Sequence, residues 1–315
     1  MIDAKAIRVI VFNCYLLYGR GVLEIKNIIE NVAVELLRQA VTKLPPDVKE
    51  ALQRARREEE SEVGKTQLEA ILNNVELAEK TSTPMCQDTG VIIFYVKAGA
   101  QAKDLDKIKD AIINATRRAT KEVPLRPNSV GIFTRKNTGD NTGRYLPYIN
   151  WDVISGDTIE LTAFPKGGGS ENICQLGMIR PGEGLNGLKK FVVDAMLKAG
   201  GKACPPNILG VGVGGGADIA MKIAKAALLR PINQPNPDPK VAKLEKELYV
   251  ALNMTGIGPM GLGGKFTVLG VNVDYANRHP ASYPVAVAGQ CWAARRASAR
   301  IHLDGTVEYL THKVR

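Results

Sequence analysis

The chain has 315 residues, of which 45% are hydrophobic, so it can bury one large core or two modest ones, which argues against a disordered protein. The net charge is +10, but the basic residues are dispersed and aromatic residues make up only 5%, which argues against a nucleic-acid-binding surface. The five cysteines form no local pair, which argues against a zinc ribbon or a disulfide-dense secreted scaffold.

The N-terminal segment, residues 1–22, is interpreted as an extension of uncertain status. Its apolar run at 9–18 is shorter than the ~20 residues of a membrane span and lacks a small-residue cleavage site. From Leu23 to about residue 82, apolar residues recur at helical spacing. This pattern breaks at Pro45-Pro46 and restarts with Asp47 as the expected helix cap. The arginines and glutamates at 54–60 are interpreted as a solvated helix face.

The rest of the chain, from about residue 83 to 315, predicts alternating strands and helices. The expected strands are 91–96, 158–164, 208–213 and 266–273. The expected helices are 105–122, about 185–198, and two that begin near residues 217 and 241. Asp304-Gly305 predicts a hairpin between 300–303 and 306–310. We therefore expect an α/β (α+β) fold in one domain, 23–315, made of a helical leader and a mixed α/β part.

Three cysteines, Cys86, Cys204 and Cys291, each stand at a turn bounded by glycine or proline. This arrangement favours one iron-sulfur cluster assembled by folding, with three protein ligands and one open iron. Small buried core thiols are the competing interpretation, because free cysteine is among the most buried residue types. Cys14 and Cys174 are assigned to packing, with Cys174 as an alternative to Cys204 in the ligand set.

One glycine motif suggests a rival function. Gly210, Gly212 and Gly215 match the G-x-G-x-x-G spacing of dinucleotide-binding proteins. The acidic residue expected about twenty positions later would be Asp238, which lies in a proline-rich connection rather than at a strand end. We therefore interpret these glycines as permitting close helix-to-sheet packing.

A second glycine run, Gly167-Gly168-Gly169, follows an expected strand and is flanked by Lys166 and Ser170. Successive backbone N–H groups in such a turn can form a concavity that binds an anion. A flexible turn is the alternative. We expect a substrate carboxylate to bind here.

Five segments together resemble the alpha subunit of the iron-sulfur (class I) fumarases and L-tartrate dehydratases. They are Met85 to Gly90, Arg126-Pro127-Asn128-Ser129, Lys166 to Asn172, Ala203-Cys204-Pro205-Pro206 and Gly289 to Arg296. The resemblance implies a [4Fe-4S] cluster on Cys86, Cys204 and Cys291. It also implies that Asp88 and His279 are catalytic, and that the substrate is bound by Gln87, Asp88, Arg126, Gly169 and His279.

The implied reaction is the reversible hydration of fumarate to (S)-malate by a two-subunit hydro-lyase. A beta subunit would supply the base and further contacts to the dicarboxylate substrate, in an α2β2-type assembly. L(+)-tartrate dehydratase is the alternative enzyme, and a non-catalytic iron-sulfur sensor is the alternative of another class. We expect a cytoplasmic protein with no nucleic-acid or membrane partner, since an oxygen-sensitive cluster and unpaired thiols favour a reducing compartment.

Overall fold

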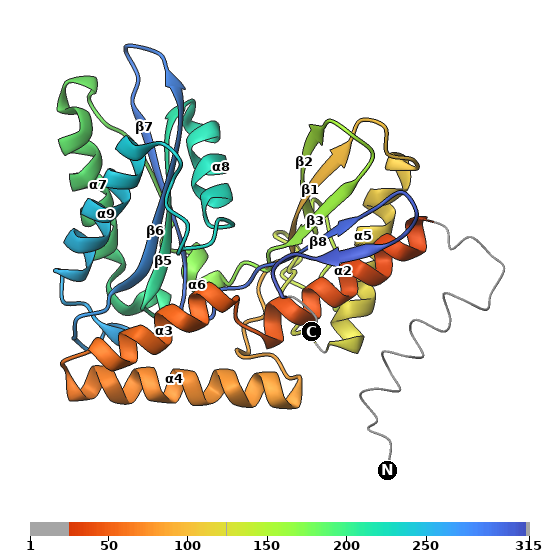
Figure 1. Cartoon of the computed structure of the whole chain (residues 1–315), viewed down its shortest axis with the longest axis horizontal. Coiled ribbons are helices and arrows are strands. Elements are labelled where there is room, and N and C mark those ends of the chain that lie inside the picture. The colour runs from red at the N-terminus through yellow and green to blue at the C-terminus, as the bar shows by residue number, and fades with distance from the viewer. Residues whose placement is uncertain (1–24, 124, 313–315) are drawn as a thin grey trace.

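The chain folds around two β-sheets that lie side by side with helices on their faces (Figure 1). The computed structural model describes residues 25–123 and 125–312, so the extension 1–22 and Cys14 lie outside the described residues. The helices are α2 (Ile25–Thr42), α3 (Pro46–Glu58), α4 (Glu62–Thr81), α5 (Leu105–Glu122), α6 (Gly168–Glu171), α7 (Gly184–Ala199), α8 (Ala217–Ala227) and α9 (Pro239–Asn253), with 3-10 turns η1 (Pro181–Glu183), η2 (Gly200–Ala203) and η3 (Pro259–Gly261). The strands are β1 (Ile93–Gly99), β2 (Tyr148–Ile154), β3 (Ile159–Ala163), β4 (Gln175–Met178), β5 (Asn207–Gly215), β6 (Val268–Arg278), β7 (Pro284–Gln290), β8 (Ala297–Ile301) and β9 (Val307–Tyr309). The expected α/β class with a helical leader is confirmed.

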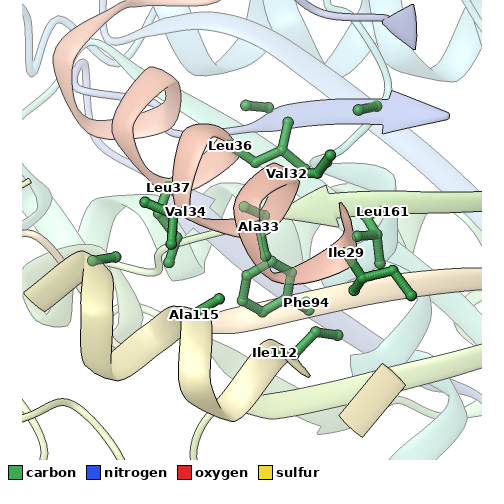
Figure 2. Packing of buried hydrophobic residues seen from close by; sticks show 14 of the residues in the cluster. Ile29, Val32, Ala33, Val34, Leu36, Leu37, Phe94, Ile112, Ala115 and Leu161 are labelled. Carbon is green, nitrogen blue, oxygen red and sulfur yellow. The ribbon is translucent and has the colours of Figure 1, made fainter. Parts of the chain in front are cut away.

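The first sheet has the strand order β2-β1-β3-β8-β9. Strands β1 and β2 are parallel, whereas the β1–β3, β3–β8 and β8–β9 pairs are antiparallel. Helices α2 and α5 pack on this sheet, and Figure 2 shows Phe94 of β1 close to Ala33 of α2 and Ile112 of α5. All three side chains are completely buried. The first leader helix is therefore part of the core of the first sheet.

The second sheet has the strand order β4-β7-β5-β6, with β5 and β6 parallel and β7 antiparallel to its two neighbours. Helix α8 packs between this sheet and the first one, and α7 and α9 cover the other face (Figure 1). A Cβ atom on Gly210 or Gly212 would lie 2.0 Å from a backbone oxygen of α8. Asp238 instead caps α9, accepting a hydrogen bond from the N–H of Lys240. The packing interpretation of this glycine motif is confirmed.

Asp47 does not cap α3. The helix begins at Pro46, so Asp47 lies in its first turn. Its carboxylate accepts a hydrogen bond from the N–H of Ile232 at 2.9 Å and pairs with the guanidinium of Arg296 at 2.6 Å. Both side chains of the ion pair are buried. The cap prediction is wrong because a charged partner far along the chain binds the carboxylate.

Glu59, at the end of α3, is not on a solvated helix face, because it is only 2% exposed. Its carboxylate accepts hydrogen bonds from the backbone N–H groups of Glu60, Ser61, Lys265 and Phe266. The sequence interpretation is wrong at this position. The carboxylate joins the α3–α4 turn to the glycine-rich loop that precedes β6.

We expect Glu59→Gln to destabilise the fold by about 2–3 kcal/mol, because hydrogen bonds to a charged acceptor are worth more than those to an amide. Burial alone would raise the pKa of Glu59, but hydrogen bonds from Lys265, Ser61 and Phe266 lower it. Its stabilising contribution is therefore present above the unfolded-state pKa near 4.5 and is lost as the pH falls through the lower folded-state pKa. Denaturant unfolding across this pH range measures both effects. The exposed neighbour Glu60→Gln is the control, and equal unfolding midpoints for the two variants would contradict the prediction.

Within residues 25–123 and 125–312, no helix has the length and apolar character that crossing a membrane requires.

Candidate functional site

Cys204 and Cys291 lie at the same end of the second sheet. Cys204 ends η2 just before β5, and Cys291 directly follows β7. These strands pair antiparallel with Ile208 opposite Gln290, and the N–H of Trp292 donates to the carbonyl of Cys204 at 3.3 Å. Cys204 also has a φ of 50°, in the left-handed backbone region that residues other than glycine rarely adopt. Such backbone outliers cluster at functional sites.

Cys86 reaches the same place from the loop that follows α4. The preceding residue, Met85, is buried, and its N–H donates to the carbonyl of Val41 in α2 at 2.9 Å. Burial raises the pKa of the Cys204 thiol, and the nearby groups of Cys291, Cys86 and Asp88 raise it further. The three predicted ligands therefore come from three separate loops and interact electrostatically.

The three thiols are the type of donor that holds an iron-sulfur cluster. All three cysteines are free and partly exposed. In the described part of the chain, no group of three or more His, Cys, Asp or Glu side chains is placed to hold one metal ion. An iron-sulfur cluster has a different requirement, because each thiolate bonds to a separate iron atom and the donors lie further apart. Three free thiols from separate loops fit an iron-sulfur cluster.

Asp88 is oriented beside these thiols by two backbone donors. The N–H of Gly90 donates to its Oδ1 at 3.0 Å, and the N–H of Gly168 donates to its Oδ2 at 2.8 Å. The side chain is partly exposed. A carboxylate held in one orientation near solvent can accept or donate a proton at a defined position.

The glycine turn expected to bind a substrate carboxylate contacts a carboxylate of this chain instead, because the N–H of Gly168 is bonded to Asp88. A Cβ atom on Gly167 would lie 3.2 Å from the Asp88 Oδ2, so a larger residue here would crowd that side chain. Gly169 is exposed at the surface of the same turn. Its assignment to substrate binding stays a prediction.

A cleft of about 520 Å³ lies between the first sheet and α8, and Gly168 is one of its lining residues. Lys166 and Lys225 also line the cleft, and Glu171 forms ion pairs with both lysines. Lys166 is 2% exposed, and burial lowers its pKa while Glu171 opposes that shift. The cleft lies next to the Asp88 carboxylate, because Gly168 lines the cleft and its N–H donates to that carboxylate.

Gln87 and Arg126 lie beside Cys86. Both side chains are exposed, and they line with Cys86 an open hollow of about 580 Å³. A guanidinium can bind a carboxylate through two parallel hydrogen bonds. The structure thus brings the predicted ligand Cys86 together with the predicted substrate-binding residues Gln87 and Arg126 at this hollow.

His279 is not brought to this place within one chain. It is exposed in the hairpin between β6 and β7, where its Nδ1 accepts a hydrogen bond from the N–H of Ala281 at 3.2 Å. Cys291 lies beyond the other end of the seven-residue strand β7. Strands rise about 3.3 Å per residue, so roughly 20 Å separate the two residues. Figure 1 shows this hairpin at the end of the second sheet that points away from α3 and α6.

Cys174 has other neighbours than the three predicted ligands. Its thiol lies 3.8 Å from the Oε2 of Glu171 and 4.0 Å from the carbonyl of Ser170. The side chain packs against the same buried apolar cluster as Cys86 and Cys291, so this contact does not separate it from the predicted ligands. Burial raises its pKa. These contacts agree with the packing role expected for it.

Arg295 is a charged residue of the site to which the sequence analysis assigned no role. It is 2% exposed, and its Nη1 would lie 2.9 Å from a Cβ atom on Gly167. Its positive charge opposes the upward shift that burial imposes on the pKa of Cys291. Its position four residues after a predicted ligand was the available signal.

Comparison with known proteins places the chain in a family. The family model described as Fumarate hydratase (Fumerase) matches residues 30–300. A Methanocaldococcus jannaschii protein, provisionally named L(+)-tartrate dehydratase subunit alpha, is 48% identical over 280 residues, which cover 88% of this chain and 98% of that protein. The L(+)-tartrate dehydratase subunits alpha of Escherichia coli K12 and Shigella sonnei are each 39% identical over 272 residues, which cover 86% of this chain and 90% of each relative. The chain belongs to the fumarate hydratase (Fumerase) family of hydro-lyases.

Proposed function

We propose that this chain is the alpha subunit of an L(+)-tartrate dehydratase, which removes water from L-tartrate to form oxaloacetate. The observation that carries a hydro-lyase site is the convergence of three free thiols beside the Asp88 carboxylate. The names of the relatives favour tartrate over the fumarate and (S)-malate pair expected from sequence. L-tartrate and (S)-malate are both dicarboxylates that lose a hydroxyl, so the same groups of the chain could serve either dehydration.

Cys86, Cys204 and Cys291 would hold a [4Fe-4S] cluster. With three thiolate ligands, such a cluster supplies one iron that can act as a Lewis acid toward the hydroxyl that leaves. The free state of the three thiols and their origin in three loops support this assignment.

The remaining groups of the chain would orient the substrate and move a proton. Asp88, held by two N–H donors, would exchange a proton with the oxygen of the leaving hydroxyl. Arg126 would bind one carboxylate in the open hollow, and Gln87 would hydrogen-bond to it there. Gly169, exposed in the adjoining turn, would contact the substrate through its backbone.

A beta subunit would complete the site. The word alpha in the names of the relatives supports a second kind of chain. This partner would supply the base that removes the C–H proton and further groups that bind the second carboxylate, in an α2β2-type assembly. The proposed role of His279 requires the β6–β7 hairpin of one chain to approach the cysteines of another, because roughly 20 Å separate them within a chain.

An anaerobic assay of the chain coexpressed with a beta subunit would test the proposal. We expect kcat/KM for L-tartrate to exceed that for (S)-malate by at least roughly tenfold, because a site that hydrogen-bonds a second hydroxyl discriminates against a substrate without it. A higher kcat/KM for (S)-malate or fumarate would favour fumarate hydratase. Turnover of none of these acids by cluster-loaded protein would favour the sensor. Malate or tartrate dehydration by the chain alone, unchanged when the beta subunit is added, would contradict the proposed partner.

A further inference from the structure

The residues that directly precede the three predicted ligands share one feature. The carbonyl of Met85, before Cys86, accepts a hydrogen bond from the side-chain amide of Asn74 at 2.8 Å. The carbonyls of Ala203, before Cys204, and Gln290, before Cys291, both accept hydrogen bonds from the amide of Asn207, at 2.9 and 3.1 Å. The carbonyl before each cysteine is therefore bound by an asparagine side chain.

Within the described residues, the side chain of Asn207 makes only these two hydrogen bonds. It is 0% exposed, and both of its partners are carbonyl oxygens, so its amide nitrogen must face them. Its Oδ1 has no hydrogen-bond partner among the described residues. A buried polar atom without a partner is costly, which indicates that the position of the amide nitrogen is what this residue provides.

A carbonyl held by a hydrogen bond helps to set the direction in which the side chain of the following cysteine points. In a trans peptide, the carbonyl of one residue and the N–H of the next point in opposite directions in one plane. Fixing the carbonyls of Met85, Ala203 and Gln290 therefore fixes the peptide planes that lead into the three cysteines. Because one amide binds both Ala203 and Gln290, it also sets the separation of two of the loops.

We infer that Asn207 and Asn74 are positioning residues that hold the three cysteine loops in the arrangement that binds a cluster. Asn207 joins the loops of Cys204 and Cys291, and Asn74 of α4 holds the loop of Cys86 on the helical leader. The inference rests on the proposed function, since it concerns the residues toward a cluster. Two residues that are not themselves ligands would thus set the geometry of the ligand set.

Matched controls distinguish positioning from general stability. Asn272 is 2% exposed, and its amide also bridges two carbonyls, those of Ala227 and Arg230, at 2.9 and 2.7 Å. It lies on β6 opposite Gly210 of β5, in the same sheet as Asn207. For Asn74, the exposed neighbour Asn73 on the same helix is the control.

The test compares Asn207→Asp, Asn207→Ala and Asn74→Ala with Asn272→Asp and Asn73→Ala. Asn74→Ala keeps the protein testable should the buried variants fold poorly, because alanine favours a helix. Thermal unfolding of the apo protein, iron and sulfide content after anaerobic reconstitution, and iron loss to a chelator are measured for each. In the apo protein, the alkylation rate of each cysteine by iodoacetamide is followed by peptide mass spectrometry.

We expect the Asn207 variants to alkylate faster at Cys204 and Cys291, and Asn74→Ala to alkylate faster at Cys86. Both should lose iron roughly tenfold faster than wild type, as for other residues that orient metal ligands. Asn272→Asp should lower the unfolding temperature without either effect, and Asn73→Ala should resemble wild type. Equal iron loss in the Asn207 and Asn272 variants, or wild-type alkylation in all variants, would overturn the inference. Wild-type protein that takes up no iron would instead overturn the proposed function, while the alkylation pattern would still test the positioning role.

Discussion

Cys291→Ser is expected to reduce the iron bound after anaerobic reconstitution by at least roughly tenfold, because residues that merely orient metal ligands already change affinity by about 10- to 100-fold. A serine hydroxyl does not replace a thiolate, which is the ligand that these clusters use. Cys204→Ser and Cys86→Ser should have the same effect. Iron and acid-labile sulfide per chain are the measurements.

Cys174→Ser is the matched control for this prediction, since Cys174 is also free and partly exposed. It should keep the wild-type iron content, because its thiol contacts Glu171 and Ser170. Full cluster content in Cys204→Ser together with loss in Cys174→Ser would replace Cys204 by Cys174 in the ligand set. Bound zinc in place of iron would overturn the cluster altogether.

Asp88→Asn is expected to lower kcat by about 100-fold or more while the cluster content stays unchanged, since general acid–base groups contribute about 10²- to 10⁴-fold. A carboxyl group can donate a proton to the leaving hydroxyl, or take one up in the reverse reaction, whereas an amide can do neither. Arg126→Ala should instead raise KM with a smaller change in kcat, because a carboxylate clamp binds ground state and transition state alike. Steady-state kinetics with the beta subunit present separates the two effects.

The change at Asp88 also removes one acceptor of a backbone N–H, so a control for structural loss is needed. Asp238→Asn removes a carboxylate that likewise accepts a backbone N–H, that of Lys240, at the start of α9. It should leave kcat unchanged. Wild-type kinetics in both Asp88→Asn and Arg126→Ala would mean that the substrate binds elsewhere.

Long periodic segments were predictable from the sequence. Helix α5 runs from Leu105 to Glu122, as its apolar spacing indicates, and the Asp304-Gly305 turn joins β8 to β9. Strands β2, β4 and β7 were not predicted. β7 is buried along its whole length, so its residues show no alternation between apolar and polar types. β2 does alternate, with apolar Ile149, Trp151 and Val153 separated by polar Asn150 and Asp152, and the sequence analysis missed this signal. Only β7 therefore lacks the alternation on which strand prediction relies.

Local spacing and turn residues were enough to predict the α/β class and the helical leader, whereas the roles of the three cysteines, Asp88 and Arg126 came from sequence motifs and stay predictions. Which partners the charged and amide side chains bind follows from the tertiary structure alone. Asp47 binds Arg296, Glu59 binds the backbone at Lys265, and Asn207 bridges Ala203 and Gln290. The last of these hydrogen bonds joins residues 83 positions apart. Contacts between distant segments depend on which strands pair and which helices pack, and residue spacing carries no record of that.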